Sequence, residues 1–124
     1  MAWKKSSERL KAVFDAALPA DRRVERRQMF GYPSAFVNGH LFTGLHEERM
    51  MVRLDEVGRA ELLGMEGAHT FEPMKGRPMK EYVVVPAHLH DDLGALRHWT
   101  ARALSYAATL PPKAKRTPKE TRKR

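Results

Sequence analysis

The 124-residue sequence contains no cysteine at all. This absence excludes disulfide bonds, zinc sites built on thiolates and a cysteine nucleophile, and it is typical of a protein from a reducing compartment. The sequence also lacks an apolar run near the length of about 20 residues that crosses a bilayer. Its N-terminus has no continuous apolar stretch of the signal-peptide kind. We therefore expect a cytoplasmic protein that does not contact a membrane.

The positive charge of the sequence is distributed unevenly. The net charge is +8, but residues 111–124 hold seven basic side chains against one glutamate. These basic residues are Lys113, Lys115, Arg116, Lys119, Arg122, Lys123 and Arg124. Residues 1–110 are close to neutral and long enough for one core. The sequence thus predicts one domain over residues 1–110, followed by a disordered basic tail at 111–124 with no apolar groups to bury.

Apolar spacing predicts helices at the two ends of this domain and strands between them. Residues 6–18 repeat apolar side chains at helical spacing, and Ser6 or Ser7 can cap the start of that helix. Asp91 or Asp92 opens a second long helix that reaches about residue 109. Asp55 is a good N-cap for a short helix between them. Asn38-Gly39 between two apolar runs favours a type I′ hairpin. Further strands are expected at 22–29, 50–54 and 82–85, so the pattern indicates an α+β domain with a mainly antiparallel sheet.

Histidines and carboxylates provide the only candidates for metal or catalytic chemistry. The segment 88–92, His-Leu-His-Asp-Asp, has alternate histidines that suit zinc or nickel if extended, but a polar loop leading to an Asp-capped helix explains it better. His46-Glu47-Glu48 lacks the second histidine of a metalloprotease helix and falls in a predicted solvated turn. His40 and His69 are isolated, and no phosphate-binding glycine loop occurs. We therefore expect no catalytic residue, no metal and no cofactor, hence a protein that is not an enzyme.

Two other groups of side chains have both a structural and a functional interpretation. Arg22, Arg23, Arg26 and Arg27 are interpreted either as a solvated strand face that pairs with acids such as Glu25, or as phosphate contacts that act with the tail. The methionines are interpreted as core and core-edge packing rather than an adaptable binding groove. This set comprises Met50, Met51, Met65, Met74 and Met79.

Several short motifs, in order and spacing, resemble the TfoX N-terminal domain family over about residues 6–108. They are Met29-Phe30-Gly31, the hairpin around Asn38-Gly39, the strands at 41–42 and 51–54, Phe71-Glu72-Pro73-Met74, the strand at 82–86 and the helix at 92–104. The resemblance implies an α-β(3)-α-β(2)-α sandwich similar to the secretion-chaperone-like fold. It also implies a link to the regulation of natural competence and DNA transformation, and it supplies no catalytic residues. Such regulators commonly continue into a helical C-terminal domain, whereas here we expect a stand-alone domain with a basic tail.

The sequence leaves three functional hypotheses open. The leading one is a non-catalytic regulatory or adaptor module whose near-neutral domain binds a protein partner. The second is a nucleic-acid-associated protein that contacts phosphates through the tail and the four arginines. The third is a domain that binds a small molecule in a pocket beside the sheet. A homodimer formed through a sheet edge is compatible with each of them.

Overall fold

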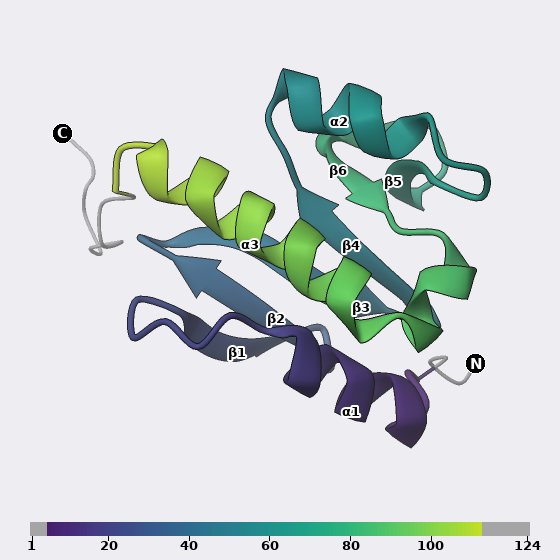
Figure 1. Ribbon diagram of the computed structural model, residues 1–124, viewed down its shortest axis with the longest axis horizontal. Coiled ribbons are helices and arrows are strands. Elements are labelled where there is room, and N and C mark those ends of the chain that lie inside the picture. Colours follow the sequence, from purple (N-terminus) through teal and green to yellow (C-terminus); the bar gives the residue numbers. More distant parts are fainter. Residues whose placement is uncertain (1–4, 113–124) are drawn as a thin grey trace, which may run out of the picture.

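The computed structural model describes residues 5–112, which form an α+β domain (Figure 1). The helices are α1 (Glu8–Ala17), α2 (Glu56–Leu63) and α3 (Leu93–Thr109), with a 3₁₀ helix, η1 (Ala87–Asp91), before α3. The strands are β1 (Glu25–Met29), β2 (Tyr32–Val37), β3 (His40–His46), β4 (Arg49–Arg53), β5 (His69–Met74) and β6 (Arg77–Val84). No helix within residues 5–112 is long and apolar enough to cross a membrane.

The strands form one antiparallel sheet in the order β1-β2-β3-β4-β6-β5. The predicted α+β class and antiparallel sheet are confirmed. Four strands precede α2, which is one more than the resemblance implies, because the charged segment Glu25–Met29 pairs with β2 as an edge strand. Its exposed polar side chains suit an edge strand that faces solvent. The likeness to the secretion-chaperone-like fold stays a prediction.

Each helix begins where the sequence predicts a cap. The Ser7 hydroxyl accepts a hydrogen bond from the backbone N–H of Leu10 at 3.1 Å, and the Asp55 carboxylate accepts one from Gly58 at 2.8 Å. Asp92 does the same for Ala95 at the start of α3, at 3.1 Å. Such caps satisfy backbone donors that have no partner within the helix. The expectation that 88–92 leads into an Asp-capped helix is therefore confirmed.

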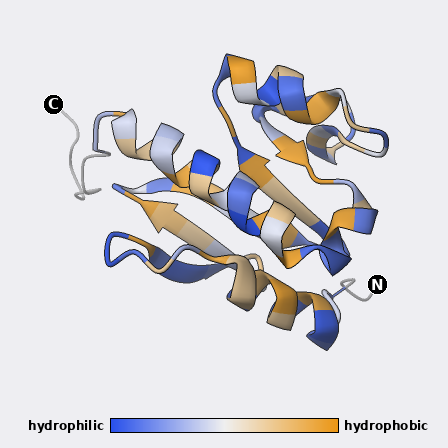
Figure 2. Cartoon of the chain, in the orientation of Figure 1, coloured by the Kyte–Doolittle hydropathy of each residue, from blue (hydrophilic) through white to orange (hydrophobic). Residues whose placement is uncertain are grey.

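The two faces of the sheet differ in what covers them (Figures 1 and 2). On one face all three helices contribute buried side chains to the main core, among them Phe14 of α1, Leu62 of α2 and Leu96 of α3. The other face carries a second apolar cluster drawn from strands alone, with Leu41, Met51, Phe71, Tyr82 and Val84 buried in it. We call the first the helical face and the second the open face. Within residues 5–112, no helix packs on the open face.

Candidate functional site

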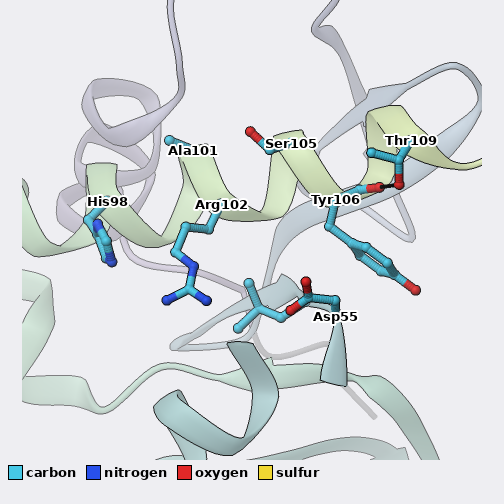
Figure 3. Close-up of a pocket in the computed structure, with 8 residues that line it drawn as sticks. Asp55, His98, Ala101, Arg102, Ser105, Tyr106 and Thr109 are labelled. Carbon is cyan, nitrogen blue, oxygen red and sulfur yellow. Dashed lines mark hydrogen bonds between the residues drawn. The ribbon is translucent and has the colours of Figure 1, made fainter. Parts of the chain in front are cut away.

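A shallow groove on the helical face lies between α2 and α3. It has a volume of about 450 Å³ and is lined by Leu54, Asp55, His98, Ala101, Arg102, Ser105, Tyr106 and Thr109. Figure 3 shows Arg102 and Tyr106 projecting from α3 toward Asp55. This collection of acid, base and hydroxyl groups is polar enough to suggest a catalytic or ligand site. Whether the groups are free for that role depends on their partners.

Three polar groups of this groove, those of Asp55, Arg102 and Tyr106, are already engaged in holding the fold together. Asp55 caps α2, and Arg102 forms an ion pair with Glu61. Tyr106 donates a hydrogen bond to Glu81 at 3.1 Å, and Glu81 also accepts one from Arg53 at 2.7 Å. Burial alone would raise the pKa of Glu81, but these partners hold that pKa below its ordinary value. We therefore assign the groove a structural role that ties α2 and α3 to the sheet.

A smaller and more apolar cavity lies on the open face, and we call it the open-face pocket. Its volume is about 350 Å³. Its lining comes from all six strands and the β1–β2 turn: Met29, Phe30, Tyr32, Ser34, Leu41, Leu45, His46, Met51, Phe71, Pro73, Met74 and Met79. In a flat sheet, β1 and β5 would be separated by five strand spacings, or about 24 Å. Both edge strands line one small pocket, so the sheet curls toward its open face.

The polar groups of the open-face pocket are few and partly buried. The His46 ring lies between two other rings, with centroid distances of 5.2 Å to Tyr32 and 5.4 Å to Phe71. Burial, the largest influence, lowers the pKa of His46 below its ordinary value, which favours the neutral imidazole. The predicted turn is found at Glu47-Glu48, whereas His46 ends β3 and its side chain is half-buried rather than fully solvated. The Ser34 hydroxyl is also buried and donates to the Tyr32 carbonyl at 3.2 Å.

Gly44 keeps the floor of the pocket open. In the sheet register it lies between Ser34 of β2 and Met51 of β4, and both neighbours line the pocket. A Cβ atom at this position would lie 3.2 Å from both the Met51 methyl and the Ser34 hydroxyl. A glycine inside a strand commonly marks a close approach. A glycine among the strand-forming residues that follow Asn38-Gly39 is such a signal, but the sequence interpretation did not include Gly44.

The rim of the pocket carries two exposed apolar side chains. Phe30 is 79% exposed and Met74 is 63% exposed. The interpretation of the methionines as core and core-edge packing is confirmed for Met50, Met51, Met65 and Met79 and wrong for Met74. Four methionines line the cavity: Met29, Met51, Met74 and Met79. Unbranched, polarizable side chains of this kind adapt to apolar partners of varied shape. The arrangement is suited to holding an apolar group rather than to moving protons.

The four arginines predicted as candidate phosphate contacts lie on and before β1, where three of them form ion pairs. Arg23 pairs with Asp21 and Arg26 with Asp15, while Arg27 pairs with Glu25 at 3.1 Å. The hydrogen bonds from Arg23 lower the pKa of Asp21 to about 2. Arg22 forms no ion pair within residues 5–112. The seven basic residues of the predicted tail, and its predicted disorder, lie outside the described residues.

The nucleic-acid hypothesis predicts that the tail contributes more to DNA binding than the four arginines do. If the chain binds duplex DNA, a chain ending at Pro112 should lose most of the affinity. With seven cations removed, the slope of log K against log salt should flatten by about 6. Replacing Arg22, Arg23, Arg26 and Arg27 with alanine should flatten it by only about 1, because three of the four already have carboxylate partners.

Titration of fluorescent DNA at several salt concentrations measures both slopes. Equal losses for the two variants would contradict this division between tail and arginines. The Pro112 end point keeps the contact between the His40 ring and the Pro111 carbonyl, at 2.7 Å. The folded part is thereby left unchanged.

The histidines of 88–92 are dispersed rather than brought together. Within the described residues, no group of three or more histidines, cysteines and carboxylates could hold a metal ion. Asp91 forms an ion pair with Arg9 of α1 instead. The His90 Nε2 atom is buried without a hydrogen-bond partner, and burial lowers the pKa of this ring. The segment thus attaches η1 to α1, whereas His40 begins β3 and His69 begins β5.

An antiparallel sheet with helices on one face and an apolar pocket on the other defines a two-layer α+β domain. The chain belongs to the TfoX N-terminal domain family, because the family model matches residues 16–107 of its 124 residues. The resemblance drawn from the motifs is thereby confirmed. A search of curated proteins finds no match to the sequence.

Proposed function

We propose that this domain is a non-catalytic regulatory or adaptor module that binds a protein partner through the open-face pocket. The observation that supports it most is the pairing of an apolar cavity of about 350 Å³ with two exposed apolar side chains at its rim. A regulatory role is also what the family resemblance implies. The non-catalytic character rests on the pocket's lining, where His46 and Ser34 are the main polar groups among apolar neighbours.

The energetics of such a contact favour apolar recognition. Full burial of a phenylalanine or methionine side chain contributes roughly 1.5–3 kcal/mol, and Phe30 and Met74 retain most of that potential because they are exposed. Aromatic and methionine side chains are enriched in the centres of protein interfaces. Two side chains standing at the rim would contact a surface wider than the pocket mouth. That width favours a protein partner.

A small apolar molecule is the second candidate occupant. The pocket volume lies within the range of about 300–1,000 Å³ that is typical of ligand sites, and the neutral His46 ring supplies one polar contact. Such a ligand would fill the cavity and leave the rim exposed. The contact made by Met74 therefore distinguishes the two candidates.

Photo-crosslinking from the rim tests the proposal. Val57 of α2 is the matched control, because it is an apolar side chain with the same 63% exposure as Met74 but lies on the helical face. A benzophenone amino acid is placed at position 74 or 57 of the full chain in its native host. We expect a discrete protein adduct from position 74 and none from position 57. Adducts from both positions, or from neither, would contradict the proposal.

A further inference from the structure

Two hairpins in this sheet have the same turn geometry but very different residues. Asn38-Gly39 joins β2 to β3 with φ angles of 52° and 82°, and Phe30-Gly31 joins β1 to β2 with φ angles of 54° and 84°. This is the type I′ geometry, in which both central residues need positive φ. Asparagine and glycine tolerate that conformation, whereas a bulky aromatic residue rarely adopts it. Phe30 therefore costs folding free energy that Asn38 does not.

Packing within one copy of the domain does not offset this cost. Phe30 is 79% exposed, so most of its ring remains in water. Residues held in strained backbone conformations cluster at active sites and ligand contacts. The ring lines the open-face pocket together with Met29 and Met74. Phe30 is therefore placed for a contact with something outside the chain.

We infer that this contact is with a second copy of the chain, in which each Phe30 enters the open-face pocket of the other copy. The inference rests on the proposed function and names its partner. A two-fold dimer pairs the same patch on both subunits, so that patch must be complementary to itself. The open face meets this condition because it carries a projecting aromatic ring and an apolar cavity side by side.

The pocket is chemically suited to a phenylalanine ring. Phe71 supplies an aromatic wall, and Met51 and Met79 supply sulfur atoms, which make favourable contacts with aromatic rings. In the same arrangement Met74, also at the rim, would be removed from water. The pocket lining that an entering ring would meet is apolar apart from the Tyr32 and Ser34 hydroxyls and the His46 ring.

The sheet edges are poorer surfaces for self-association than the open face. Edge strand β1 exposes Glu25, Arg26, Arg27 and Gln28 in succession, and charged edges oppose strand addition. Edge strand β5 contains Pro73, which has no backbone donor, and its pairing with β6 is interrupted twice. A dimer through a sheet edge, one of the alternatives drawn from the sequence, is therefore disfavoured relative to a dimer through the open face.

Sedimentation equilibrium of the full chain tests this inference with the variant Phe30→Asn. A contact of this small size predicts a dimer between about 10 µM and 1 mM. Phe30→Asn should weaken association at least about tenfold, as expected for a central aromatic anchor. The same variant should raise the melting temperature measured below the dimerisation range, because Asn-Gly is the favoured pair for this turn. A substitution that merely damaged the fold would lower it.

Two controls accompany the variant. Phe30→Tyr keeps the ring and should keep the dimer, and Val57→Asn makes the same change at an exposed apolar residue on the helical face and should leave association unchanged. A chain that stays monomeric up to about 1 mM overturns the inference. So does an undiminished dimer, or a lower melting temperature, in Phe30→Asn. A photo-adduct from position 74 with a different protein alone would leave the proposed function standing and this inference refuted.

Discussion

Replacing Phe42 with alanine is expected to lower the free energy of unfolding by about 3–5 kcal/mol. Phe42 has no exposed surface and lies on β3 within the main core of the helical face, where α3 crosses the strand (Figure 1). Removing the ring would forfeit its transfer free energy and leave a cavity that packed neighbours cannot fill. Urea denaturation followed by circular dichroism measures the loss.

Phe71→Ala is the matched variant on the open face. Phe71 is also buried, but it belongs to the strand-only cluster and borders the open-face pocket. Its removal enlarges a space that water already reaches, so we expect a smaller loss of about 1–2 kcal/mol. Losses of equal size would show that the open face acts as a second closed core. That result would contradict its assignment as a binding surface.

Gly44→Val is expected to abolish binding at the open-face pocket while the domain remains folded. The new side chain would point between Ser34 and Met51 and occupy the pocket floor. Gly44 has no positive φ, so valine meets no backbone strain there, and it suits a strand. The nearest atoms are the methyl end of Met51, a flexible side chain that can move, and the Ser34 hydroxyl, both at 3.2 Å, with the Pro33 carbonyl oxygen at 3.4 Å.

The readout for Gly44→Val is the photo-adduct from position 74 together with the melting temperature. We expect the adduct to fall at least about tenfold, because a filled pocket excludes the anchoring side chain. Gly94→Ala, at the start of α3, is the control, since its added Cβ makes only an ordinary contact of 3.7 Å with Asp92. A Gly44→Val chain that is folded and still forms the adduct would exclude the pocket as the binding site.

Cap residues and turn residues in the sequence correctly predicted where the three α-helices begin and where one hairpin turns. Ser7, Asp55 and Asp92 all cap helices where their side chains suggested, and the Asn38-Gly39 hairpin has the expected geometry. The β1–β2 hairpin was missed because phenylalanine is a poor residue for its turn. The residue preference of the turn therefore failed at Phe30. This is the position where we infer that a contact with a second copy, rather than folding, determines the residue.

The open-face pocket could not be predicted from the spacing of residues along the sequence. Its lining residues come from six strands, and only the pairing of those strands in the sheet brings them together. His46 was assigned to solvent from its polar neighbours in sequence, yet Tyr32 and Phe71 cover its ring. Met74 was assigned to packing, yet it stands at the rim. The sequence could not decide whether the arginines at β1 pair with acids or remain available for phosphates. Arg26, for example, pairs with Asp15 of α1, which is distant in the sequence.

The most direct test of the open-face pocket as a binding site uses methionine methyl groups as NMR probes. Met50 and Met51 are adjacent in β4 but belong to opposite faces, since Met50 lies in the main core and Met51 lines the pocket. The full chain, with methyl-labelled methionine, is titrated with N-acetylphenylalaninamide, which mimics an aromatic side chain. We expect the Met51 and Met79 signals to shift by ring currents while Met50 and Met65 stay unchanged. Shifts confined to Met50 and Met65, or none at all, would contradict the assignment of this pocket as the binding site.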